Sequence, residues 1–251
     1  MTTKLSAAAT LTWLLLALGG TVHATEVVSV GRVDIQLPGE GWQSYAVPDQ
    51  GNSMSGMGES HRQQTETRVL LRRAPDQSID AVFIVRANAS GKGRFSGVLF
   101  PDARCEGPAG TFTEGEPPSP AARSFRCLYV SPAGSVGDPE QFLQQMLGQQ
   151  TLGPLGEEGL KLAPSMHLVL AVQHANTGAF ADVKALVAPE VLPALSAASG
   201  PSAEALPAGV TAASLQWGRL LQKAVTDSVY SIRGKLPVPE LLPSGAPARS
   251  N

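Results

Sequence analysis

Pairs of alternating segments joined by turn residues are the feature that most restricts how this chain can fold. Four such segments form two pairs, 66–73 with 78–87 and 166–175 with 180–187. Pro75-Asp76 lies between the first two segments and Asn176-Thr177-Gly178 between the second two, and both are turn sequences. Apolar residues at every second position, interrupted by a turn, predict a β-hairpin. The chain is therefore predicted to build an antiparallel sheet from hairpins.

Shorter segments add further predicted strands. Val33, Ile35 and Leu37 share one face of a segment that opens at Val27. The other predicted strands cover residues 43–47, 95–100 and 124–130. Both faces of 78–87 carry apolar residues, which is typical of a central strand covered on both sides. The polar, glycine-rich residues 48–61 are expected to form a loop.

Two helices are predicted. The longer one covers about residues 212–232, with Thr211 as its N-cap. Its apolar stripe, interpreted as core, repeats at steps of three and four and consists of Trp217, Leu221, Ala224, Val225, Ser228, Val229 and Ile232. A shorter helix is predicted to start at Asp138-Pro139 and to present Phe142, Leu143, Met146 and Leu147. Hairpins with two helices predict an α+β domain, in which the helices pack on a mainly antiparallel sheet.

The opening of the predicted domain has a specific order of residues. A strand over 31–37 runs into Leu37-Pro38, and Gly41-Trp42 leads into the next strand. This order resembles the opening of Mog1/PsbP-like domains, and a late amphipathic helix is compatible with them. The resemblance implies an α/β/α sandwich with an antiparallel sheet. That family has accessory and binding roles without one common chemistry, so the resemblance assigns no functional residue.

The first residues have the order of a secretory signal peptide. Lys4 precedes an apolar run from Ala7 to Leu18, and Val22-His23-Ala24 is a small-residue cleavage signal. We expect cleavage near Ala24, which removes residues 1–24. Residues 25–236 are then expected to form a single α+β domain, and the Pro-rich residues 237–251 a disordered tail. Export, together with abundant Ala, Gly, Pro and Arg, favours the bacterial periplasm or secretion as the location.

Charge and hydropathy restrict the partners. The chain has 19 basic and 21 acidic residues, so neither sign dominates. Nucleic-acid binding through a basic face is therefore not expected. After the leader, no apolar stretch reaches the ~18–20 residues that span a bilayer, so the mature chain is expected to have no transmembrane span.

The two cysteines are expected to form a disulfide, because their number is even and the chain carries an export signal. Cys105 and Cys127 enclose a loop rich in Gly and Pro, which cannot form a packed core. Loop-closure arithmetic gives such a crosslink roughly 3 kcal/mol. Two buried free thiols are the alternative. A catalytic redox pair is not expected, since the C-x-x-C spacing is absent.

Catalytic and metal-binding motifs are weak in this sequence. The G-x-S-x-G and H-E-x-x-H patterns are absent. The histidines of the mature chain are His61, His167 and His174. His167 and His174 lie seven residues apart on one predicted strand, so their side chains are expected on opposite faces, where they cannot share a metal ion. We expect one of them to be exposed and the other to pack beside Val172. No catalytic residue, metal site or cofactor is therefore assigned.

Three further groups of polar or sulfur-containing residues have patterns that bear on function. Met54, Met57 and His61 have ligand types that suit Cu(I), although two methionines and a histidine in a loop are also common by chance. A second group contains the basic residues Arg68, Arg72, Arg86, Lys92 and Arg94, which are suited to an anion site or a partner-docking patch. The favoured alternative is a solvated sheet face partly paired with Glu66 and Asp80. Asp182 and Lys184 are expected at a wet strand edge.

The sequence favours a non-enzymatic, exported bacterial protein that acts by binding or as an accessory component of the cell envelope. Its expected partner is an envelope protein or a small apolar ligand. A hydrolase without a standard motif and a carrier of an apolar ligand or lipid are the alternatives. A cleft in which His61 or His174 meets a Ser or Asp favours the hydrolase, and a closed apolar pocket favours the carrier.

Overall fold

The computed structural model describes several stretches of the chain. These are residues 26–47, 65–89, 109–115, 124–132, 166–175, 179–193, 206–232 and 234–243, with Cys105, Leu143 and residues 161–162. The strand path is also described for residues 53–56 and 59–62. All structural statements below concern these residues.

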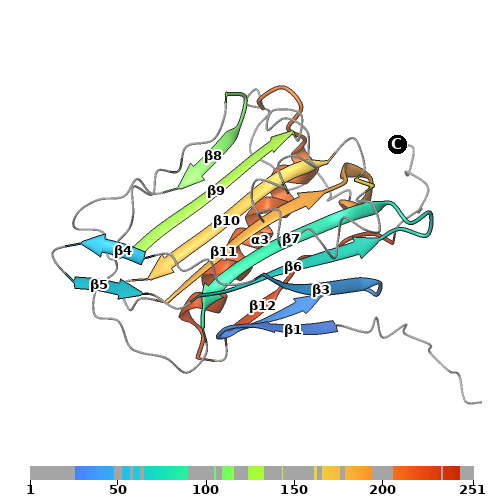
Figure 1. Ribbon diagram of the computed structural model, residues 1–251. Helices are drawn as coiled ribbons and strands as arrows, with labels where there is room; N and C mark the ends of the chain where they lie inside the picture. The colour runs from blue at the N-terminus through green and yellow to red at the C-terminus, as the bar shows by residue number, and fades with distance from the viewer. Residues whose placement is uncertain are drawn as a thin grey trace, which may run out of the picture.

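A seven-stranded antiparallel sheet forms the centre of the fold, with the strand order β3-β6-β7-β11-β10-β9-β8 (Figure 1). Its strands are β3 (Trp42–Val47), β6 (Thr65–Arg73), β7 (Ile79–Asn88), β8 (Phe112–Gly115), β9 (Ser124–Pro132), β10 (His167–Ala175) and β11 (Phe180–Val187). The hairpins predicted over 66–87 and 166–187 are present as β6–β7 and β10–β11. The prediction of a mainly antiparallel α+β fold is thus confirmed.

Two smaller sheets flank the large one. The first joins β1 (Glu26–Val30) and β2 (Val33–Leu37) in an antiparallel pair, with β12 (Lys235–Pro237) parallel to β2. The second is the hairpin of β4 (Ser53–Gly56) and β5 (Glu59–Arg62), within the residues that the sequence assigns to a loop. Gly31 adopts a positive φ of 56° in the β1–β2 turn, so the segment that opens at Val27 is two strands rather than one.

The helix α3 (Ala212–Tyr230) covers one face of the large sheet and lies behind it in the view of Figure 1. Thr211 and Ser214 form a capping box at its start, which confirms the predicted N-cap. The helix ends at Tyr230, so Ile232 lies outside it and is fully exposed, contrary to its place in the predicted stripe.

The main core lies between α3 and the sheet. Trp217 is fully buried, and its ring centroid lies 6.1 Å from that of Phe83, which in turn lies 5.3 Å from Trp42. Gly218 lets the helix approach the sheet closely, because a Cβ there would lie 3.1–3.3 Å from Val130, Val169 and Leu128. The interpretation of Trp217 as core is confirmed.

More of the chain after α3 is packed against the core than the sequence predicts. Val238 and Leu241 are buried in the main core, and the Val238 N–H donates to the carbonyl of Gln36. The expected tail is therefore packed as far as residue 243. Pro189–Val191 forms a 3-10 turn (η2) in the connection before α3. The predicted strand 95–100 and the predicted helix from Asp138 lie outside the described residues, except for Leu143, which is helical and buried.

Candidate functional site

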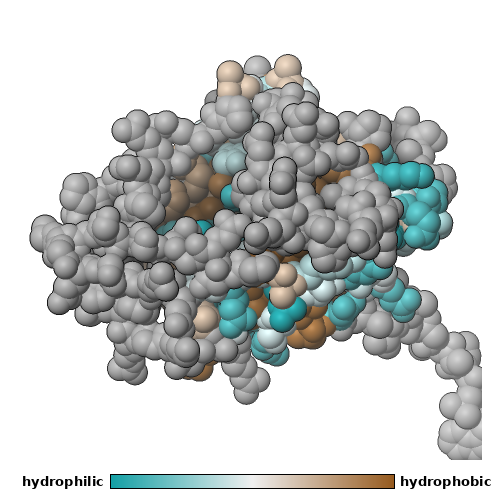
Figure 2. All heavy atoms as spheres, viewed as in Figure 1, coloured by the Kyte–Doolittle hydropathy of each residue, from teal (hydrophilic) through white to brown (hydrophobic). Residues whose placement is uncertain are grey.

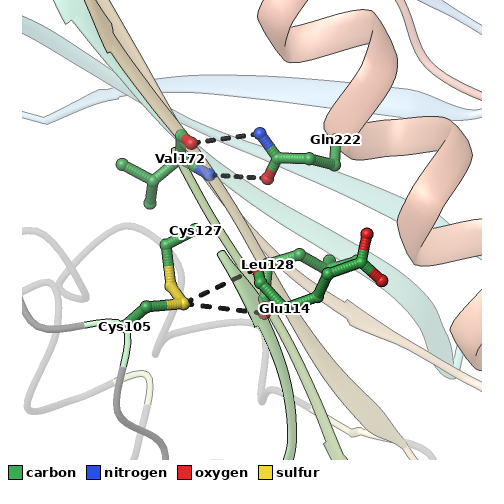
Figure 3. Close-up of a disulfide and its surroundings, with 6 residues drawn as sticks. All are labelled: Cys105, Glu114, Cys127, Leu128, Val172 and Gln222. Atoms are coloured by element: carbon green, nitrogen blue, oxygen red, sulfur yellow. Dashed lines mark hydrogen bonds between the residues drawn. A yellow bond between two sulfur atoms is a disulfide. The ribbon is translucent and has the colours of Figure 1, made fainter. Parts of the chain in front are cut away.

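The predicted disulfide between Cys105 and Cys127 is present, with a Cα–Cα distance of 5.3 Å. It joins Cys105 to β9 beside the short edge strand β8 (Figure 3). The Cys105 Sγ lies 3.7 Å from the carbonyl oxygen of Glu114 and 3.8 Å from that of Leu128. These are close contacts, because a disulfide sulfur carries no proton to donate. The crosslink thus contacts the backbone of the edge strand β8 and of its neighbour β9.

A groove of about 220 Å³ lies between α3 and the strands β8 and β9. We call it the α3–β9 groove. Its lining residues are Glu114, Arg126, Leu128, Arg219, Gln222, Lys223 and Thr226. The disulfide lies on the other side of the strands from the helix, whereas the carboxylate of Glu114 points toward α3 (Figure 3). The groove is partly open, and most of the surface that lines it is apolar, although Leu128 is the one lining residue without a polar side chain.

The charges of the α3–β9 groove are unequally paired. The Nε of Arg219 donates to one carboxylate oxygen of Glu114 at 2.9 Å, and a terminal guanidinium nitrogen lies 2.9 Å from the same oxygen in an ion pair. Lys223 forms an ion pair with Asp227, one helical turn further on. Arg126 is exposed and has no ion pair or side-chain hydrogen bond in the structure described above. The groove therefore contains one guanidinium that is available to an anion.

The floor of the groove is fixed by Gln222. Its amide donates to the carbonyl of Val172 at 3.1 Å and accepts from the N–H of the same residue at 3.2 Å (Figure 3). The neighbouring Thr226 hydroxyl donates to the side chain of Gln173 at 3.1 Å. Helix and sheet are thus held together by polar contacts on this side, and the groove has a defined width.

A second polar cluster lies on the opposite face of the sheet. The Nε2 of His174 lies 2.7 Å from one carboxylate oxygen of Asp182, and Arg86 approaches the other oxygen at 3.3 Å. The rings of Phe125 and Phe180 flank His174, with centroid distances of 6.0 and 5.2 Å. Hydrophobic side chains are visible on this face over β9 and β10 (Figure 2). The arrangement pairs a histidine with a carboxylate that orients its ring.

Asp182 and Lys184 are not at a wet edge, contrary to the prediction. Their strand, β11, lies between β7 and β10 in the middle of the sheet. Burial lowers the pKa of Lys184, and this effect exceeds the opposite influence of the Asp182 carboxylate. The sequence pattern did not show this, because an antiparallel strand with two polar residues reads the same at an edge and in the centre.

The two strand histidines lie on opposite faces, as predicted. His167 shares the helix-facing side of β10 with Val169, whereas His174 shares the other face with Val172. The expectation that one of them is exposed is wrong. His167 is 6% exposed and the side chain of His174 is 15% exposed. Burial lowers the pKa of His167.

The arginines that the sequence analysis groups together lie on both faces of the large sheet. Arg72 pairs in register with Ala81 on the helix side, and Arg86 lies on the other face, near Asp182. A register shift between Arg72 and Arg73 lets Asp80 reach Arg72, with N–O distances of 2.9 and 3.1 Å. Arg72 is thus paired with Asp80, as the alternative expects, but the pair is buried and does not lie on a solvated face.

Arg68 does not form an anion site with the other arginines. Its guanidinium lies 3.4 Å from the hydroxyl of Ser44 on the neighbouring edge strand. Glu66 accepts from the backbone N–H of Gly31 instead of pairing with these arginines. Lys92 and Arg94 lie outside the described residues.

The predicted copper ligands are only partly described. Met54 and His61 are register partners across β4 and β5, while Met57 lies outside the described residues. The Cu(I) hypothesis therefore stays a prediction. Among the described residues, no group of three or more His, Cys, Asp and Glu side chains has the geometry to hold a metal ion.

The sequence did not reveal the α3–β9 groove. Its residues come from β8, β9 and α3, which are far apart in the chain. One signal was present: the polar residues 219, 222, 223 and 226 repeat at steps of three and four, beside the apolar stripe of α3. Such a stripe indicates that the helix has a second, polar face, but it does not indicate which strands lie opposite that face.

Comparisons with protein-family models, curated proteins and solved structures found no match to this chain. The resemblance to Mog1/PsbP-like domains therefore stays a prediction. The disulfide fits an extracellular or periplasmic protein. No helix in the described residues is long and apolar enough to cross a membrane.

Proposed function

We propose that this chain is an exported bacterial binding protein, an accessory component of the cell envelope, whose α3–β9 groove holds an oxyanion of its ligand. The observation that carries the proposal is the guanidinium of Arg126 in that groove, which is exposed and has no ion pair or hydrogen bond with any other described residue. The oxyanion is a carboxylate or a phosphate, since a planar guanidinium matches both through two parallel hydrogen bonds.

The other charges of the groove support this assignment. The Glu114 carboxylate neutralises Arg219, and Asp227 neutralises Lys223, so the positive charge of Arg126 remains uncompensated. An ion pair between an exposed guanidinium and an anion contributes a modest binding free energy, on the order of 1 kcal/mol. At about 220 Å³ the groove encloses one anionic group, and the rest of the ligand lies outside it.

The test is a titration of the full mature chain with inorganic phosphate and with acetate, followed by NMR of the backbone amides. Signals of α3 and β9 are expected to shift, and Arg126→Gln is expected to weaken the affinity about tenfold. Arg68→Gln is the matched control, because Arg68 is also an arginine on a strand but lies outside the groove. An unchanged affinity in Arg126→Gln, or an equal loss in Arg68→Gln, overturns the proposal.

The envelope location rests on the leader and on the disulfide, and it has its own test. Cell fractionation of a tagged chain should place it in the periplasm or the medium, with Thr25 as the first residue by N-terminal sequencing. Crosslinking followed by mass spectrometry then identifies the envelope partner. Retention in the cytoplasm with an intact residue 1–24 segment contradicts this part of the proposal.

A hydrolase is the second candidate, and the contact between His174 and Asp182 favours it. A carboxylate that orients a histidine is the arrangement of a general base. Turnover of a panel of ester and amide substrates, lost in His174→Ala, supports this candidate; no turnover at any pH from 5 to 9 rejects it. The apolar-ligand carrier has less support, because Trp217 and Phe83 fill the described interface between sheet and helix.

A further inference from the structure

The disulfide and the α3–β9 groove share the strand β8. On one side of this strand, Cys105 Sγ lies 3.7 Å from the carbonyl oxygen of Glu114. On the other side, the carboxylate of Glu114 points toward α3 (Figure 3) and accepts a hydrogen bond from Arg219. The following residue, Gly115, is packed so tightly on the crosslink that a Cβ would lie 2.9 Å from the sulfur. The disulfide therefore holds the backbone that positions the acidic wall of the groove.

Few other described contacts hold β8. It has four residues, pairs with β9 alone, and leaves Thr113, Glu114 and Gly115 exposed. Phe112 is half-buried, and the guanidinium of Arg219 lies 5.5 Å from its ring centroid. A short edge strand with so little burial opens at a low free energy compared with the central strands. Its attachment therefore depends on the disulfide more than that of any strand inside the sheet.

We propose that the Cys105–Cys127 disulfide sets the anion affinity of the α3–β9 groove, an inference that rests on the proposed function. The reductant is an exported dithiol, which gives two electrons and two protons and becomes a disulfide. The bond between the two Sγ atoms breaks and two thiols form. β8 then opens, the Glu114 carboxylate leaves Arg219, and a second guanidinium joins Arg126 in the groove.

The direction of the effect follows from charge. In the oxidised protein Glu114 both occupies Arg219 and repels an incoming anion. Without Glu114, the groove offers two guanidinium groups to one oxyanion. One additional charge-assisted contact corresponds to an affinity about tenfold higher. The reduced protein is therefore the form that binds phosphate more tightly.

The experiment measures phosphate affinity and backbone hydrogen exchange in the oxidised chain and after reduction with dithiothreitol. Reduction is expected to speed exchange in residues 112–115 while the exchange of β7, β10 and β11 stays slow. Cys105→Ser/Cys127→Ser should behave like the reduced chain without any reductant. Glu114→Gln in the oxidised chain should show the same gain in affinity, and reduction should then add nothing further.

The outcomes separate this inference from the proposed function. If neither redox form nor Glu114→Gln binds phosphate, the proposed function is wrong. If the oxidised chain binds phosphate through Arg126 but reduction changes neither exchange at 112–115 nor affinity, only the redox inference is wrong. If reduction unfolds the whole chain, as judged by circular dichroism, the inference is also wrong, because the disulfide then supports the fold rather than one strand.

Discussion

Gln222 of α3 forms two hydrogen bonds with the backbone of one residue, Val172, in the middle of the sheet. Its amide nitrogen lies 3.1 Å from the Val172 carbonyl oxygen and its amide oxygen lies 3.2 Å from the Val172 nitrogen. Both groups are buried. The helix is thus fixed to β10 by a contact that depends on the position of a single side chain, and this contact forms the floor of the α3–β9 groove.

Removing this contact should destabilise the fold. Gln222→Leu keeps the size of the side chain but leaves two buried backbone groups without this partner. We expect a loss of about 2 kcal/mol in the free energy of unfolding. Chemical denaturation measures it. The adjacent Lys223→Gln is the control, since Lys223 is exposed and its pair with Asp227 contributes less than about 1 kcal/mol. Equal stability of the two variants contradicts the role given to Gln222.

The buried pair of Arg72 and Asp80 supports a second prediction. Arg72 is 4% and Asp80 5% exposed, and Arg72 also donates to the carbonyl of Leu242 at 3.2 Å. Arg72→Met leaves the Asp80 carboxylate buried beside an apolar group, and such a change costs about 3–5 kcal/mol. The midpoint of thermal unfolding should therefore be lower in Arg72→Met than in the natural chain.

The matched variant for this pair is the double change Arg72→Met with Asp80→Asn, which also removes the buried negative charge. It should lose less free energy than the sum of the two single changes. Strictly additive losses would show that the two side chains do not stabilise each other.

Part of this fold was accessible from the sequence, and part was not, for physical reasons. The hairpins β6–β7 and β10–β11 and the helix α3 have local signals: alternation, turn residues and an N-cap. The burial of the Arg72–Asp80 pair was missed, because the register shift that brings Asp80 to Arg72 leaves the apolar pattern of 78–87 intact. The shift arises from the way β6 and β7 pair, so the residues of one strand alone do not indicate it.

The candidate site was less accessible than the fold. The disulfide could be predicted from cysteine number and export alone. Glu114 and Arg219 are separated by 105 residues, and nothing in the sequence near either one indicates the other. The site therefore depends on the order of strands in the sheet, which places β8 and β9 beside the edge of α3.

Gly218 provides a third prediction about packing. The helix backbone at this position lies against β9 and β10, and a Cβ would lie 3.1 Å from Val130 Cγ2 and 3.2 Å from Val169 Cγ1. Gly218→Ala should therefore destabilise the fold by about 1–3 kcal/mol, despite the higher helix propensity of alanine. Denaturant unfolding measures the change. A more stable variant would show that α3 can move away from the sheet without loss.

His167 makes the stability depend on pH. Its side chain is buried on the helix-facing side of β10, and its Nδ1 has no hydrogen-bond partner among the described residues. Burial lowers the pKa of His167 below the ordinary value of 6.5, and the nearby Glu190 carboxylate opposes this only in part. The unfolded chain therefore binds a proton at a higher pH than the folded chain does.

The sign of the pH effect follows from this difference. Above pH 6.5 the imidazole is neutral in both states and costs nothing. As the pH falls below 6.5 toward the folded-state pKa, the unfolded state gains protons first, so the free energy of unfolding decreases. Denaturation curves between pH 8 and 5 should show this decrease in the natural chain and a smaller one in His167→Leu. Identical pH profiles would show that His167 is not the group that titrates.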